Sequence, residues 1–164
     1  MATATYIPIA TQTLGSAAAS ITFNSIPGTY TDLRLVLTCT TSATDVVTVQ
    51  FNSDTAANYS VTSYWGNGTS ANSSYSTSVT SAYVGFSAST STTVPAMYLV
   101  DVFSYAGSTN KTALANAAAD QNGSGGVSAV VALWRSTAAI TSVKLLLVSG
   151  SNFNSGTIAT LWGI

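Results

Sequence analysis

The chain has 164 residues, enough for one domain with a substantial hydrophobic core, and 46% of the residues are hydrophobic. Only 5% are charged, against about 25% in ordinary soluble domains, and the formal net charge is −1. The apolar content excludes charge-driven disorder, and the four scattered Lys and Arg residues provide no basic patch for nucleic acid. No apolar run approaches the roughly 20 residues of a membrane-spanning helix, so neither nucleic acid nor a membrane is an expected partner.

The exterior that this composition predicts is neutral and rich in Ser and Thr. Near-zero net charge provides little repulsion between copies and favours association. Hydroxyl groups also form hydrogen bonds with a neighbour without the desolvation cost of buried charges. We therefore interpret the surface as one that a partner covers, and a low-charge adhesive domain is the alternative.

The N-terminal segment, residues 1–15, reads MATATYIPIATQTLG. It lacks a basic leader and a long apolar run, so we expect no secretory signal. Its apolar side chains include Tyr6, Ile7 and Ile9. Two placements fit equally well: an extended arm that adds a strand to a neighbour's sheet or docks on a larger surface, or the first strand of the domain's own sheet.

Period-two alternation of apolar and polar residues recurs along the rest of the chain and predicts about ten short strands. The segment ALANAAAD at 113–120 permits a helix, but its shortness and its neighbours favour a strand, while residues 66–78 are expected to form an exposed loop. Turn-forming clusters separate the strands, and the whole pattern predicts a single all-β domain over 1–164, an antiparallel β-sandwich or jelly roll. The expected strands cover Ser20 to Ser25, 31–40, 45–52, Asn58 to Trp65, Val79 to Ser87, Met97 to Tyr105, Thr112 to Ala118, Val127 to Trp134, 141–149 and Thr157 to Gly163.

The residue types that enzymes use are scarce. The chain has no His and only five acids, all Asp and well separated, which argues against a catalytic triad, a glycosidase carboxylate pair and most zinc sites. The Gly-rich QNGSGG at 121–126 lacks the Lys of a phosphate-binding loop and fits a hairpin turn. Asn52, Asp54 and Asn58 offer oxygens to a calcium ion, but local Asx turns are the favoured interpretation. The sequence therefore predicts no enzyme and no cofactor.

Asp101 lies in YLVDVFSY among residues expected to be buried, and a buried carboxylate needs a partner. We hypothesise a structural salt bridge to Arg34 or Arg135 on a neighbouring strand. Cys39 has no second cysteine to pair with, and its alternating apolar surroundings predict a buried structural thiol.

Aromatic residues gather in the most polar part of the sequence. Tyr64, Trp65 and Tyr75 are the candidates to anchor an interface or to stack on sugar rings. Tyr and Trp are also common on half-buried sheet faces, and the sequence does not decide between these roles.

Five segments, in order along nearly the whole chain, are similar to segments of one protein family: ITFNSIPGTYTDLRLVL (21–37), FNSDTAANYS (51–60), LVDVFSYAGSTNKTAL (99–114), LWRSTAAITSVKL (133–145) and SGTIATLWGI (155–164). Together they resemble small virion proteins of tailed bacteriophages, common among phages of cyanobacteria and other aquatic bacteria. Members usually read FNGDTGSNYS and end in LYGI. Here Ser53, Ala56 and Trp162 stand in place of those residues, so a turn that favours glycine is expected to adopt a slightly different geometry.

The resemblance implies a structural protein of the virion, assembled in the host cytoplasm, with no catalytic residues to transfer. Two roles follow from it: a capsid decoration or cement protein that binds the major capsid protein, or a tail, baseplate or fibre component that contacts host glycans. The resemblance also implies a homo-oligomer, and a trimer is expected because such proteins sit on symmetry axes. An enzyme acting on host envelope sugars is the remaining alternative, and it would depend on Asp45, Asp54 and Asp101.

Overall fold

The computed structural model describes residues 5–85 and 90–164. Within them the chain forms twelve antiparallel strands in two sheets and no helix, which confirms the all-β prediction. No part of the described chain forms a helix with the length and hydropathy that a membrane crossing requires.

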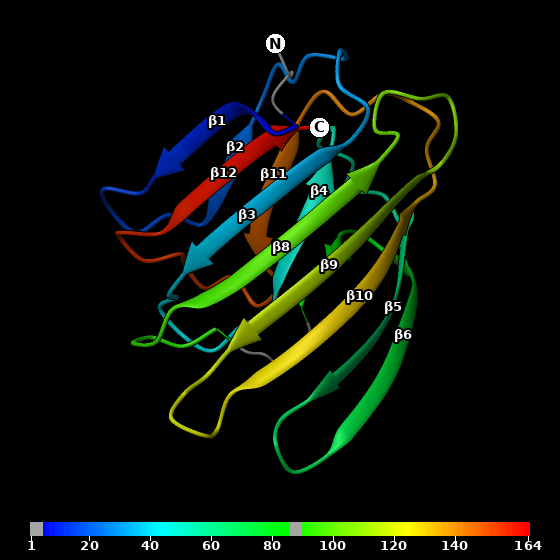
Figure 1. Ribbon diagram of the computed structural model, residues 1–164. Coiled ribbons are helices and arrows are strands. Elements are labelled where there is room, and N and C mark those ends of the chain that lie inside the picture. The colour runs from blue at the N-terminus through cyan, green and yellow to red at the C-terminus, as the bar shows by residue number, and fades with distance from the viewer. Residues whose placement is uncertain (1–4, 86–89) are drawn as a thin grey trace.

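The two sheets lie face to face, with the larger one in front in Figure 1. The larger sheet has eight strands, which in spatial order are β1 (Ile7–Thr13), β12 (Ile158–Gly163), β3 (Leu33–Cys39), β8 (Ala96–Phe103), β9 (Lys111–Ala119), β10 (Gly126–Trp134), β5 (Tyr59–Gly66) and β6 (Ala71–Val79). The smaller sheet has four, in the order β2 (Ser20–Phe23), β11 (Val143–Leu147), β4 (Val47–Phe51) and β7 (Ala82–Tyr83). This strand order does not confirm a jelly roll.

The hydrophobic core lies between the sheets and explains the alternation in the sequence. In β3, Leu33, Leu35 and Leu37 are buried while the residues between them are half-buried or exposed. In β9 every second residue is a buried Ala or Lys111, so the Ala-rich segment is a strand whose small side chains leave room for larger neighbours in the core.

The expectation that residues 66–78 form an exposed loop is wrong. Asn67 to Ser70 makes a tight turn, in which the Asn67 amide donates to the Ser70 carbonyl at 3.3 Å and Gly68 adopts a φ of +86°. The chain then continues as β6, paired with β5 along its length. Most side chains of β6 are exposed on both faces, so the sequence carries no hydrophobic alternation that would have revealed the strand.

Other boundaries moved by a residue or two, with one larger difference. Where one strand was expected over Val79 to Ser87, Val79 ends β6 and Ala82–Tyr83 forms the short strand β7, while residues 86 and 87 lie outside the described residues. At the N-terminus, β1 pairs with β12 of the same chain, so the segment is the first strand of the domain's own large sheet.

The C-terminal Trp-Gly-Ile lies at the end of β12, between β1 and β3 of the large sheet. A Cβ atom on Gly163 would lie 2.3 Å from the Tyr30 ring, so only glycine leaves space for that ring. The Ile164 carbonyl accepts hydrogen bonds from the amides of Thr31 and Asp32. The last residues therefore hold the loop before β3 in place.

Two buried ionisable side chains fasten loops to the sandwich. Lys111 Nζ donates to the carbonyls of Gly107 and Thr109, and burial lowers its pKa. Asp45 accepts hydrogen bonds from the Ser151 hydroxyl at 2.6 Å and from the Ser149 amide. Burial raises the pKa of Asp45, but these hydrogen bonds outweigh it and hold the pKa below the ordinary value. Both groups therefore have structural partners within the domain.

Candidate functional site

The possible calcium ligands are used by the protein itself. Asp54 Oδ1 accepts from the Ala56 amide at 2.9 Å, which is an Asx turn. Asp54 Oδ2 accepts from Asn58 Nδ2 at 2.9 Å and from Trp134 Nε1 at 2.7 Å, and these bonds lower the pKa of Asp54. Asn52 Oδ1 accepts from the backbone amides of residues 141 and 142. Among the described residues, no three His, Cys, Asp or Glu side chains cluster as a metal site would require.

The side chains of the large sheet that point away from the core form a surface that we call the outer face. Its centre is apolar and spans four adjacent strands, β8, β9, β10 and β5. The apolar side chains there are Tyr64, Met97, Leu99, Leu114, Ala118, Val127, Ala129 and Val131. Several are well exposed, including Val127 at 63% and Met97 at 55%.

The strand register makes these side chains neighbours. Leu114 on β9 lies opposite Val131 on β10. Two rows further along the same face, Met97 on β8 lies opposite Ala118, which in turn lies opposite Val127. The row between them runs from Leu99 on β8 through Asn116 on β9 to Ala129 on β10, and Asn116 is exposed. Side chains opposite each other in adjacent strands are within contact distance, so the apolar side chains form one cluster around a single uncharged polar residue.

The described charged side chains on the outer face neutralise each other. Arg34 and Asp101 lie opposite each other on β3 and β8 and form a bidentate pair, with Nε to Oδ1 at 2.6 Å and Nη2 to Oδ2 at 2.7 Å. The carboxylate of Asp101 raises the pKa of Arg34. Arg135, the other partner considered for Asp101, donates to the Ala57 carbonyl instead. The outer face therefore has no net charge from these residues.

Tyr6 extends this pair toward the sheet edge. Its hydroxyl accepts a hydrogen bond from Arg34 Nη1 at 2.7 Å, and the guanidinium carbon lies 5.1 Å from the ring centroid. Ile7 is 41% exposed, whereas Ile9 is partly buried and packs against the domain's own core. Of the three N-terminal candidates, only Tyr6 and Ile7 are thus exposed on the surface.

The aromatic candidates separate into two groups. Tyr64 and Tyr75 project from the outer face of β5 and β6 and are 67% and 75% exposed. Trp65 is on the opposite side of β5 and is half-buried. Hydroxyl side chains flank the two tyrosines, and a shallow hollow there is lined by Thr62, Ser73, Ser74 and Tyr75.

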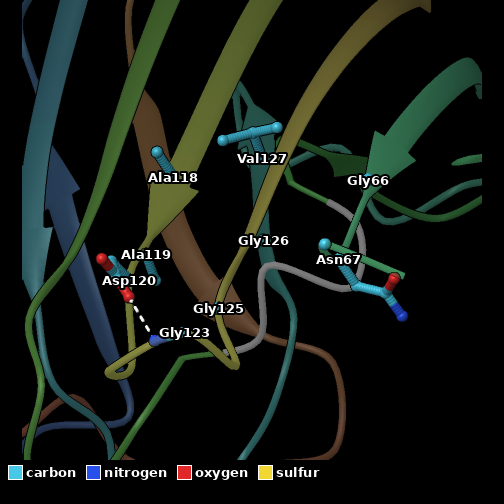
Figure 2. Close-up of a pocket in the computed structure, with 10 residues that line it drawn as sticks. Gly66, Asn67, Ala118, Ala119, Asp120, Gly123, Gly125, Gly126 and Val127 are labelled. Carbon is cyan, nitrogen blue, oxygen red and sulfur yellow. Dashed lines mark hydrogen bonds between the residues drawn. The ribbon is translucent and has the colours of Figure 1, made fainter. Parts of the chain in front are cut away.

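A second hollow, of about 410 Å³, lies at the tips of the β5–β6 and β9–β10 hairpins (Figure 2). Glycine backbone supplies much of its lining, and Ala118 and Val127 add apolar side chains. Asp120 Oδ1 accepts the Gly123 amide at 2.9 Å, so this carboxylate holds the hairpin turn that QNGSGG was predicted to form. The hollow lacks the arrangement of acids, bases or nucleophiles that catalysis needs.

Cys39 is 1% exposed on the inner side of β3, as predicted, and burial raises its pKa to about 12. The sequence predicted a surface that a partner covers, but it did not locate that surface on the outer face of the large sheet. The signal for this location is present in runs such as Val130 to Leu133, where apolar residues occupy both faces of one strand. A strand that is apolar on both faces is typical of one covered on both sides.

No protein-family model matches the chain, and comparison with curated proteins finds no match. The outer face described above is therefore the structural basis for a functional proposal.

Proposed function

We propose that this chain is a structural protein of a tailed-phage virion, a capsid decoration or cement protein that binds the shell through the outer face of its large sheet. The observation that carries the proposal is the apolar, charge-neutral centre of that face. From strand spacings of about 4.8 Å and rises of about 3.4 Å per residue, four strands of eight residues cover about 500 Å² in all, and the apolar side chains occupy the larger part of it. Exposed apolar patches of this size on single domains commonly mark an interaction site.

Cementing requires contacts of this kind. A protein that binds only the assembled shell stabilises it by mass action, by about 2.7 kcal/mol per site at a free concentration of 100 times Kd. Burial of the apolar centre provides the attraction, and the paired Arg34 and Asp101 leave no unpaired charge to desolvate. The partner that fits is the major capsid protein or another virion protein with a low-charge apolar surface.

Copy number tests the role. Quantitative mass spectrometry of intact particles measures this chain relative to the main shell protein. A count equal to the shell protein, or a simple fraction of it, supports a decoration or cement protein. A count of a few copies per particle refutes that role and supports a tail or fibre component.

Variants test the surface. Val131→Lys places a charge at the centre of the outer face, where Val131 is 45% exposed, so the fold tolerates it while binding to particles is expected to be lost. Val148→Lys is the matched control, because Val148 is 52% exposed but follows β11 of the small sheet. If both variants bind particles like the parent chain, the outer face is not the binding surface.

One observation favours the tail or fibre alternative. Tyr64 and Tyr75 are exposed beside Ser and Thr hydroxyls, an arrangement suited to stacking on and hydrogen bonding with a host glycan. Under this alternative, the chain binds host cells or their polysaccharide, and Tyr64→Ala and Tyr75→Ala each weaken that binding. Absence of binding by the parent chain would eliminate it.

A further inference from the structure

We infer that β6 pairs with β6 of a second copy of this chain, antiparallel and about a two-fold axis at Tyr75, so that two large sheets become one. β6 is the last strand of the large sheet and has nine residues. Within the part of the chain that the structure describes, β5 is its only strand partner, and Figure 1 shows it at the sheet margin. Its outer edge thus presents a row of backbone amides and carbonyls.

The other sheet margins have features that block pairing, and β6 lacks them. β1 contains Pro8, which has no amide proton, and a register shift between Pro8 and Ala10. In the small sheet, the margins are β2 with four residues and β7 with two. Proline, bulges and short strands are the usual protections of a sheet edge, as are charged side chains. β6 reads ANSSYSTSV, without charge or proline, and its one irregularity lies at its end, near Val79.

The register of the β5–β6 hairpin determines which backbone groups face outward. The Asn67 amide donates to the Ser70 carbonyl, and hydrogen-bonded and non-hydrogen-bonded pairs then alternate along an antiparallel ladder. By this alternation Asn72 and Ser74 direct their backbone groups to β5. Ser73, Tyr75 and Thr77 direct theirs to the open edge.

These outward groups are complementary to themselves. Tyr75 is the middle residue of β6. A two-fold axis through it pairs Tyr75 with Tyr75 of the second copy, and Ser73 with Thr77 of the second copy. Ser73, Tyr75 and Thr77 thus each meet a residue of the second copy whose backbone groups also need a partner, as an isologous contact requires.

The Tyr75 side chain supports the same axis. At 75% it is the most exposed of the large hydrophobic side chains that the structure describes. Across the proposed contact, the two Tyr75 rings are cross-strand neighbours and cover each other. The contact leaves the apolar centre of both outer faces open, so it does not depend on the proposed capsid role. It predicts a dimer, where the resemblance to phage proteins implies a trimer.

Sedimentation equilibrium of the full chain over a range of concentrations tests this inference. The parent chain is expected to show a monomer–dimer equilibrium. Ser73→Pro removes an outward amide, which an edge strand tolerates, and should raise the dimer Kd about tenfold or more because two symmetric hydrogen bonds are lost. Ser73→Ala keeps the amide and should dimerise like the parent. Thermal unfolding of both variants shows that the fold is intact.

A covalent trap tests the register. Ser74 and Ser76 of the second copy form a non-hydrogen-bonded pair in the proposed contact, with Cα atoms about 4.5 Å apart, within disulfide range. The double variant Ser74→Cys, Ser76→Cys should form a covalent dimer under mild oxidation, since Cys39 is buried and does not compete. A parent chain that is monomeric or trimeric at all concentrations overturns the inference. A dimer that persists in Ser73→Pro but is lost in Val131→Lys also overturns the inference, because such a dimer forms through the outer face and not through β6.

Discussion

The Arg34–Asp101 pair offers the sharpest test of the energetics, through the substitution Asp101→Asn. Both charge-assisted bonds are short, and the side chains of Arg34 and Asp101 are 28% and 15% exposed. Exposed ion pairs contribute about 0.2–1 kcal/mol, and breaking a buried pair costs about 3–5 kcal/mol. This half-buried pair lies between those limits, so we expect Asp101→Asn to cost about 1–2 kcal/mol. For a domain of this size the melting temperature should fall by about 3–6 °C.

Thermal unfolding followed by circular dichroism measures the loss, and a cycle with Arg34→Gln isolates the pairwise part, expected at about 1 kcal/mol. Asp120→Asn is the matched control. Asp120 lies in an exposed turn and its Oδ1 accepts only a backbone amide, a role that an Asn oxygen can also fill. Its effect should stay within about 0.5 kcal/mol. An unchanged melting temperature in Asp101→Asn would refute the view that the pair stabilises the fold.

Three further predictions concern other parts of the sandwich. The pKa of Asp45 is depressed in the folded state, so its contribution to stability is present above its unfolded pKa of about 3.9 and is lost as the pH falls through the lower folded value; urea unfolding between pH 7 and pH 3 measures this loss. Ser53 has a φ of +56°, in the region that glycine favours, so Ser53→Gly should raise the free energy of unfolding by about 0.5 kcal/mol in urea titration. Gly163→Ala should lower it by about 1–3 kcal/mol, because the new methyl group overlaps the Tyr30 ring, and the same titration detects it.

Each of these has a control. Asp45→Asn should be less stable at pH 7, and its free energy of unfolding should fall less between pH 7 and pH 3. If it falls as steeply as in the parent chain, other groups cause the loss of stability in acid. Ser53→Ala keeps a Cβ atom at this positive φ and should not gain the stability of Ser53→Gly. Equal stability of the two variants contradicts the strain argument. Tyr30→Ala creates space beside Gly163, and Gly163→Ala should then cost much less; an additive double variant argues against the overlap.

The sequence alone predicted the all-β fold class, because the alternation of apolar and polar residues that indicates a strand lies within a few consecutive residues. Alternation such as Leu33, Leu35, Leu37 reports directly which side of a strand is buried, and the Ala-rich segment followed the same period once its neighbours were considered. The absence of His and the separation of the five Asp residues likewise needed no structure. The same logic failed for β6, because a strand exposed on both faces leaves no apolar period to detect.

The rest was decided by tertiary structure, since it depends on which strands become neighbours. Asp101 required a cation, but only the pairing of β3 with β8 placed Arg34 beside it, while Arg135 contacts Ala57. The outer face exists because registers across β8, β9, β10 and β5 align apolar residues far apart in sequence. Alternation specifies that a side chain leaves the core, whereas its neighbours on that surface are set by strand order. Strand order in turn follows from the packing of the whole chain around one core.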